Sequence, residues 1–123
     1  MSILLNHTIV AAIDPAAEAA WVADVLGLGA PTRFGPFHVV ATDNDVSLDF
    51  MHVSAPVGQH YAFLVSEEEF DAVSARLAER GVPTWGDPGH QRPGLNTNDG
   101  GRGRYFDSPA GHGLEIITRP YGG

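Results

Sequence analysis

The chain has 123 residues, 43% of them apolar, which is enough for one domain with a core of its own. It contains no cysteine, so disulfides, thiolate metal sites and cysteine nucleophiles are excluded, and any metal must take nitrogen and oxygen ligands. A formal net charge of -8 makes nucleic acid a poor partner, and no apolar run approaches the ~20 residues of a membrane span. The start, MSILLNHTIV, lacks the basic region and cleavage site of an export signal, which indicates a cytoplasmic protein.

The first half of the chain predicts a strand, a helix and a further set of strands. Residues 3 to 13, ILLNHTIVAAI, favour a strand, and Asp14 followed by Pro15 is typical of a helix start. Gly27 suits the end of that helix. The helix is expected to bury residues at helical spacing, which are Trp21, Val25 and Leu28. The strands that follow are expected at residues 37 to 42 and 46 to 53, with a short strand near 31 to 35.

The second half repeats this order with a longer loop. HYAFLV favours a strand, and Ser66 with Glu69 forms a capping box for a helix that ends at Gly81. The helix carries a buried stripe of Phe70, Val73 and Leu77. A polar segment, residues 86 to 104, then leads to two strands, GRYFDS and GLEIITR.

This doubling predicts an α+β fold made of two β-α-β-β-β units. We expect the units to cover residues 1–55 and 58–120 of a single domain, residues 1–123. Such units form a curved mixed sheet with helices outside, whose concave face is left to hold a ligand.

Four polar side chains interrupt the apolar strands at matched positions. His7 begins the first unit and Asp49 lies in its last strand; His60 begins the second unit and Glu115 lies in its last strand. Taken singly, each is more typical of a hydrogen-bonded core histidine or a solvent-facing acid. Two imidazoles and one or two carboxylates on one concave sheet indicate a metal site that suits Fe(II), Mn, Ni, Co or Zn.

The segments LNHTIV, DVLGLG, SLDFMHV, QHYAFLV, FDAVSARLAERG and GRGRYFDSPAGHGLEIIT occur in the order found in the vicinal oxygen chelate superfamily, which the chain resembles over nearly its whole length. That superfamily includes glyoxalase I, extradiol dioxygenases, fosfomycin-resistance enzymes and bleomycin-binding proteins. The resemblance implies that His7, His60 and Glu115 are the metal ligands. Asp49 matches the position of a fourth ligand, a glutamate, in glyoxalase I. Because aspartate is shorter, Asp49 is expected to bind a water or to act as a catalytic base.

The segments HYAFLVS, FDAV, PGLNTNDGGRGRYF and IITRPYGG resemble more closely the branch typified by a tailoring oxygenase of the chartreusin pathway. This resemblance implies a metal-dependent dioxygenase that cleaves or rearranges an aromatic polyketide in antibiotic biosynthesis. It favours Fe(II), with molecular oxygen as co-substrate. Superfamily members are usually dimers, so a homodimer is expected, and a reductase is a further candidate partner.

Other residues are candidates for contacts with the substrate. Tyr105 is placed to hydrogen-bond a bound phenolate, because it is expected one strand away from Glu115. Arg102 and Arg104 of the loop GHQRPGLNTNDGGRGR are candidates to meet an anionic or quinone oxygen, whereas the alternative is a glycine-rich surface loop. Aromatic walls are expected from Phe50, Phe63 or Trp85. The remaining histidines are given no chemistry and are His38, His52, His90 and a structural His112.

Two other functions compete with the oxygenase. A binding module that sequesters a drug-like aromatic compound uses its polar strand residues for hydrogen bonds alone. A glyoxalase-like isomerase or lyase uses a metal and no oxygen. Retention of both histidines and Glu115 favours an enzyme, because a pure binder does not need them.

Overall fold

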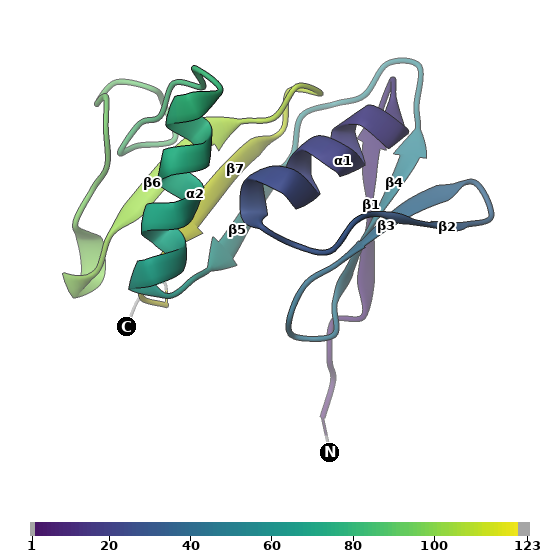
Figure 1. Ribbon diagram of the computed structural model, residues 1–123, viewed down its shortest axis with the longest axis horizontal. Coiled ribbons are helices and arrows are strands. Elements are labelled where there is room, and N and C mark those ends of the chain that lie inside the picture. The colour runs from purple at the N-terminus through teal and green to yellow at the C-terminus, as the bar shows by residue number, and fades with distance from the viewer. Residues whose placement is uncertain (1, 121–123) are drawn as a thin grey trace. The chain divides into compact units, whose positions relative to one another are not determined.

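The computed structural model describes residues 2–120, and the chain divides between Val57 and Gly58 into two compact units (Figure 1). Residues 121 to 123, the end of the motif IITRPYGG, lie outside this range. Within the described residues no helix has the length and apolarity that a membrane span requires. Each unit holds one helix and one small mixed sheet, as the α+β prediction expects.

The first unit contains a four-stranded sheet in the order β1-β4-β3-β2. Strand β1 runs parallel to β4, and the other neighbours are antiparallel. The predicted β-α-β-β-β order is confirmed for this unit. Its elements are β1 (His7–Ala12), α1 (Pro15–Leu26), β2 (Thr32–Phe34), β3 (Phe37–Ala41) and β4 (Ser47–His52).

Helix α1 begins and ends where the sequence predicts. The Asp14 side chain accepts a hydrogen bond from the Ala17 N–H, and Pro15 occupies the first turn, where its missing N–H is not needed. Gly27 ends the helix with φ 70, in the left-handed region that favours glycine. Of the predicted buried stripe, only Val25 is fully buried; Trp21 and Leu28 are half-buried.

The expected strand at residues 3 to 13 is too long at its start. Strand β1 begins at His7, and the preceding Ile3, Leu4 and Leu5 are exposed. The reason lies in β4, whose ladder with β1 starts at Ser47, directly after a turn closed by Thr42 N–H and Val46 O. No β4 residue is left to pair with the chain before Asn6.

The second unit contains a three-stranded sheet in the order β5-β7-β6. Strand β7 is parallel to β5 and antiparallel to β6. The elements are β5 (His60–Leu64), α2 (Glu67–Glu79), the short 3-10 helix η1 (Asn98–Gly100), β6 (Gly103–Asp107) and β7 (Gly113–Ile117).

This unit differs from the first between α2 and β6. Where the repeat expects a full strand, Trp85 makes isolated bridges to Tyr105 and to Pro93. Pro83, Pro88 and Pro93 supply no backbone N–H, so this segment does not extend into a regular ladder.

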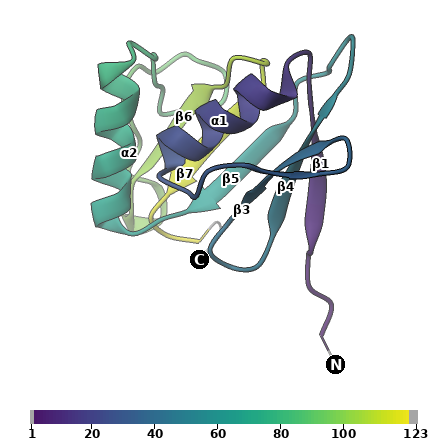
Figure 2. The ribbon, with the colours of Figure 1, turned by 45° about the vertical axis from the view of Figure 1, so that its right-hand side comes forward.

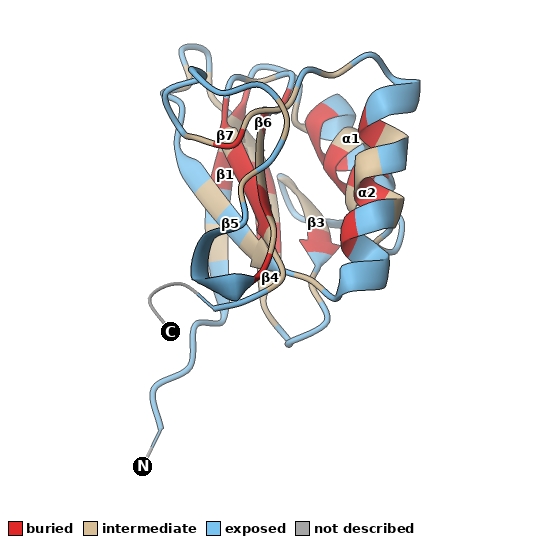
Figure 3. Cartoon of the chain, turned by 90° about the vertical axis from the view of Figure 1, so that its left-hand side faces the viewer, coloured by how far each residue is buried: buried red, intermediate tan, exposed pale blue. Residues whose placement is uncertain are grey.

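Helix α2 carries the predicted capping box, in which Ser66 and Glu69 exchange side-chain and backbone hydrogen bonds. The predicted stripe of Phe70, Val73 and Leu77 is buried. Figures 2 and 3 show the helix alongside β6 and β7, with its exposed residues on the outer side. The sheet of this unit therefore has one face toward α2 and one face away from it.

Candidate functional site

Strand alternation sorts the residues of the second unit onto two faces. Leu114 and Ile116 of β7 are fully buried and pair with Phe106 and Arg104 of β6 on the face toward α2. Glu115 lies between them in sequence, so its side chain points to the opposite face. We call this second surface the open face; its members follow from the register and include His60, Ala62, Tyr105, Glu115 and Ile117.

His60 and Glu115 meet on the open face. His60 Nε2 lies 3.2 Å from Glu115 Oε1, and the side chains are 52% and 5% exposed. The carboxylate is therefore almost removed from water, while the imidazole borders solvent. A buried carboxylate is destabilising by several kcal/mol unless a positive or hydrogen-bonding group meets it. Two of the three predicted ligands are thus brought together.

The hydrogen bond made by His60 Nδ1 determines whether His60 Nε2 is a donor or an acceptor. His60 Nδ1 lies 3.0 Å from the carbonyl oxygen of Gly113, which can only accept, so Nδ1 carries a proton. In a neutral imidazole, Nε2 then presents a lone pair to the carboxylate of Glu115. Two hydrogen-bond acceptors would then face each other and repel. A proton on Nε2, or a cation bound between Nε2 and the carboxylate, removes this repulsion. An imidazole held through its Nδ1–H by a backbone carbonyl is the usual arrangement of a metal-binding histidine.

The separation fits a shared metal. Ligand bonds of about 2.0 to 2.2 Å at tetrahedral or octahedral angles place two ligand atoms about 2.8 to 3.6 Å apart. The observed 3.2 Å lies in that range. One nitrogen and one carboxylate oxygen are also the donors that suit Fe(II), Mn or Zn. The pair therefore fits a divalent metal in both chemistry and spacing.

The first unit presents a similar pair. His7 pairs with Ser47 and Ile9 pairs with Asp49, so His7 and Asp49 share the face of this sheet turned away from the buried Val10 and Phe50. His7 Nδ1 lies 2.7 Å from the Asn6 amide oxygen, which again leaves Nε2 as the ligand atom. Asp49 accepts a hydrogen bond of 2.8 Å from the Ser47 hydroxyl.

The complete ligand set is not assembled within either unit. Among residues 2–120, no group of three His, Asp or Glu side chains close enough to hold a metal ion is present. His7 belongs to the first unit, whereas His60 and Glu115 belong to the second. The role of His7 as third ligand and that of Asp49 as base or water-binding residue stay predictions.

Tyr105 lies where the sequence predicts. It pairs with Glu115 across β6 and β7, and its ring stacks on His60 at a centroid distance of 5.9 Å and an interplanar angle of 27°. A phenol hydroxyl on the same face as both His60 and Glu115 can donate to an oxygen of a bound molecule. Its catalytic role stays a prediction.

The two predicted substrate arginines turn toward the helix. Arg102 forms ion pairs of 2.8 and 2.9 Å with Glu67 and Asp71, and its guanidinium lies 4.3 Å from the Phe70 ring centre. Those carboxylates raise the pKa of Arg102. Arg104 donates to the Thr84 hydroxyl at 2.9 Å, and burial lowers its pKa. Arg104 is therefore not brought to the face that carries Glu115.

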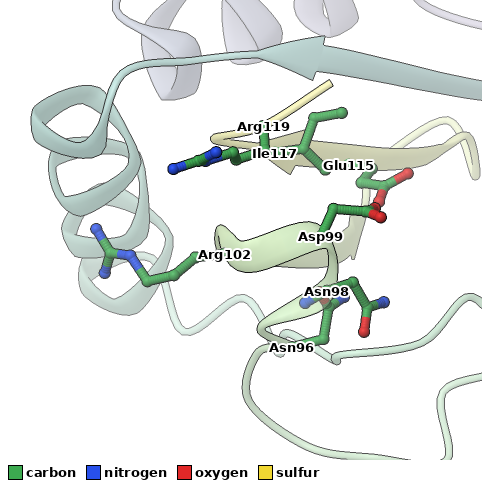
Figure 4. A pocket seen from close by; sticks show the side chains of 7 residues that line it. All are labelled: Asn96, Asn98, Asp99, Arg102, Glu115, Ile117 and Arg119. Carbon is green, nitrogen blue, oxygen red and sulfur yellow. The ribbon is translucent and has the colours of Figure 1, made fainter. Parts of the chain in front are cut away.

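A pocket borders the open face at Glu115 and Ile117. Figure 4 shows the Arg102 side chain extending from this pocket toward α2. Glu115 and Ile117 contribute from β7, and the polar loop before β6 supplies much of the remainder. The lining residues are Asn96, Asn98, Asp99, Arg102, Glu115, Ile117 and Arg119. The predicted polar loop thus forms part of the surroundings of Glu115.

Of the three expected aromatic walls, Trp85 alone reaches the open face. Phe50 is buried in the first unit, and Phe63 pairs with Ile116 on the face toward α2. Trp85 pairs with Tyr105 and stacks on His90, with ring centroids 3.7 Å apart and an interplanar angle of 6°. The sequence does not reveal this stack, because a contact across a loop leaves no periodic signal.

Three kinds of comparison place the chain among known proteins. A family model described as Glyoxalase/Bleomycin resistance protein/Dioxygenase superfamily matches residues 4–116. The glutathione transferase FosA of Serratia marcescens is 30% identical over an alignment of 119 residues, gaps included, which covers 91% of this chain and 78% of that protein. A glyoxalase/dioxygenase structure from Nostoc punctiforme, 20% identical with a TM-score of 0.72, covers 98% of each chain and supports the fold alone.

Two solved structures are much more similar. Oxidase ChaP-H1 is 61% identical with a TM-score of 0.96, covering 99% of this chain and 100% of that chain. Oxidase ChaP-H2 is 55% identical with a TM-score of 0.96, covering 99% and 98%. Together with the match of the family model, these likenesses show that the chain belongs to the glyoxalase, bleomycin resistance protein and dioxygenase superfamily, the vicinal oxygen chelate proteins.

Proposed function

We propose that this protein is a metal-dependent oxygenase that cleaves or rearranges a C–C bond of an aromatic polyketide. Its likeness to two proteins named as oxidases, at 61% and 55% identity over nearly the whole chain, carries this proposal. The likeness to the glutathione transferase FosA, at 30% identity, is more distant. A drug-binding protein and a glyoxalase-like isomerase are therefore less favoured.

The proposed metal ligands are His60, Glu115 and His7, with Fe(II) as the metal and molecular oxygen as co-substrate. The fit of the His60 and Glu115 donor atoms to metal spacing supports the first two. When bound, the metal supplies Lewis acidity and a template for vicinal substrate oxygens.

The side chains around this centre have separate tasks. The Gly113 carbonyl holds the Nδ1–H of His60 and so keeps its Nε2 directed at Glu115. The Tyr105 hydroxyl donates a hydrogen bond to a phenolate oxygen of the substrate and stabilises its negative charge. Asp49, oriented by the Ser47 hydroxyl, accepts the proton of a substrate phenol.

Metal analysis tests the site. We expect Fe(II) or Mn(II) to bind the wild type and to bind His60→Ala, Glu115→Ala and His7→Ala at least about tenfold more weakly, as loss of a ligand requires. His52→Ala is the matched control, because His52 Nδ1 also meets a backbone carbonyl, that of Ile13, at 2.8 Å. Equal metal content in all these proteins contradicts the site.

A reaction tests the activity. The Fe(II)-loaded protein is incubated with a polycyclic phenol, with and without oxygen and a reductant, and the products are followed by mass spectrometry. We expect an oxygen-dependent change in substrate mass that His60→Ala abolishes. Stoichiometric binding with unchanged ligand mass, equal in His60→Ala, supports the sequestering protein instead.

We also propose a homodimer. Strands β1 and β5 are edges of their sheets, and exposed edges favour pairing with another chain unless they are covered. Residues exposed before and along β1 include Leu5 and Ile9. Sedimentation at micromolar concentration tests this, and a single monomeric species contradicts it.

A further inference from the structure

We propose that the indole of Trp85 is a stacking platform for the far end of a planar, multi-ring substrate, and that His90 covers this platform until the substrate replaces it. This inference rests on the proposed function, since it takes the substrate to be anchored beside His60 and Glu115. It adds a specificity-determining residue that lies two strands across the sheet from Glu115.

The backbone places Trp85 in line with the anchor. Trp85 and Tyr105 exchange backbone hydrogen bonds of 2.9 and 2.7 Å, and Tyr105 is in turn the register partner of Glu115. Paired residues point to the same face, so the three side chains form a row across the open face. Neighbouring strands are about 4.8 Å apart, which puts Trp85 about 10 Å from Glu115 along this row. A single ring bound at Glu115 does not reach the indole, whereas a system of three fused rings does.

The row already holds flat rings. The Tyr105 ring stacks on His60 near one end, and the His90 ring lies parallel to the Trp85 indole at the other, with centroids 3.7 Å apart. The indole face therefore accepts a planar partner at van der Waals distance. A fused aromatic system offers the same face with a larger overlap, and aromatic stacking of this kind strengthens with area.

His90 is held in a way that permits its replacement. Its φ of 58 lies in the left-handed region, which non-glycine residues adopt at a cost. Its side chain is 37% exposed, and its Nε2 lies 3.5 Å from Asp107 Oδ1, a distance too long for a strong hydrogen bond. The turn that carries it is anchored through backbone groups: the His90 N–H donates to the Asp87 carbonyl at 3.3 Å, and the Asp87 carboxylate accepts from the Gln91 and Arg92 N–H groups. The imidazole can therefore move by side-chain rotation while the turn keeps its shape.

Binding of two probes tests the proposal by calorimetry on the metal-loaded protein without oxygen. Catechol has one ring and alizarin has three, and both carry vicinal oxygens. We expect Trp85→Leu to weaken alizarin at least about fivefold, as loss of one stacked ring does, and to leave catechol within about twofold. Trp85→Phe keeps a smaller ring and is expected to fall between, while Trp21→Phe is the control. His90→Ala is expected to strengthen alizarin about two- to tenfold, because it removes the competing ring.

The outcomes separate the platform from the metal site. Unchanged alizarin affinity in a folded Trp85→Leu protein, or an equal loss of both probes, overturns the platform. Weaker alizarin binding in His90→Ala overturns the replacement of His90. If His60→Ala binds both probes as tightly as the wild type does, the proposed metal anchor is wrong. The platform is tested separately, by whether Trp85→Leu weakens alizarin more than catechol.

Discussion

His60 Nε2 lies 3.2 Å from Glu115 Oε1, although 55 positions of sequence separate the two residues. The parallel pairing of β5 and β7 produces this contact, because it sets His60 opposite Gly113 and Ala62 opposite Glu115. Both side chains then occupy one face, diagonally adjacent. The Gly113 carbonyl on the neighbouring strand holds the imidazole in place.

This relationship predicts a metal-dependent gain in stability. With free Fe(II) or Mn(II) at about 100 times its dissociation constant, the wild type is expected to gain about 2.7 kcal/mol, seen as a rise in Tm. Glu115→Gln removes one charged ligand and is expected to lose most of that rise. Glu79→Gln, at the end of α2, retains it. A full rise in Glu115→Gln contradicts the assignment of this carboxylate.

Tyr105→Phe separates the ring of Tyr105 from its hydroxyl. Phenylalanine keeps the ring that stacks on His60, so metal content is expected to match the wild type. Loss of a hydrogen bond to a charged oxygen is worth about 1.5 to 3 kcal/mol, so binding of catechol is expected to weaken by at least about tenfold. The measurement is anaerobic titration calorimetry. Unchanged catechol affinity assigns Tyr105 to packing alone.

The helix starts, the order of elements along the first unit and the position of Tyr105 one strand away from Glu115 were all predictable from sequence. Each rests on local chemistry, such as the Asp14 cap or the Ser66 and Glu69 capping box, or on alternation along a strand. The approach of His60 to Glu115 was predictable as well, since these residues hold the places in the second unit that His7 and Asp49 hold in the first.

The surroundings of the site were less predictable. Arg104 sits one position before Tyr105, and alternation turns it toward Phe70 of α2 instead of toward Glu115. The sequence left the register of β6 open, so either face was available to it. The stack of Trp85 on His90 arises from a loop whose turn depends on Asp87, and such contacts have no period in the sequence.

Acidic pH should weaken the link between α2 and the segment before β6. Hydrogen bonds from the Thr118 hydroxyl and the Arg102 guanidinium lower the pKa of Glu67 below its ordinary value of 4.5. A carboxylate with a lowered pKa in the folded state stabilises the protein above about pH 4.5, and this contribution disappears as the pH falls through the folded value.

Glu67→Gln is therefore expected to lower Tm slightly at pH 7, and the difference from the wild type is expected to shrink as the pH falls below 4.5 and through the lowered folded-state pKa of Glu67. The exposed position of Glu67 keeps the effect small, because solvent screens its charge. Glu68→Gln, in the same first turn of α2, controls for the helix dipole. A difference that persists unchanged into acid contradicts the ionic origin.

Gly86 is expected to govern the position of Trp85. It is buried, and a Cβ at this position would lie 2.9 Å from both the carbonyl carbon and the oxygen of Leu95 and 3.2 Å from the Asn96 nitrogen. These are backbone atoms that a side-chain rotation cannot move, and the Asn96 amide also donates to the Gly86 carbonyl at 2.7 Å. Gly86→Ala must therefore displace the chain beside Trp85, at a cost of about 1 to 3 kcal/mol.

Gly89→Ala in the same loop is the matched control, because its nearest contacts would lie at 3.4 Å and 3.8 Å, which are ordinary van der Waals distances. Its stability is expected to stay within about 0.5 kcal/mol of the wild type. Denaturant unfolding measures both variants, and near-ultraviolet circular dichroism reports the setting of the Trp85 indole. Because the indole is held through the backbone bonds of residues 84 to 86, we expect Gly86→Ala alone to change that spectrum and to reduce alizarin binding more than catechol binding. Equal stability and equal spectra for the two variants would show that the loop accommodates a side chain at Gly86, and the rigid support that the Trp85 platform needs would then be absent.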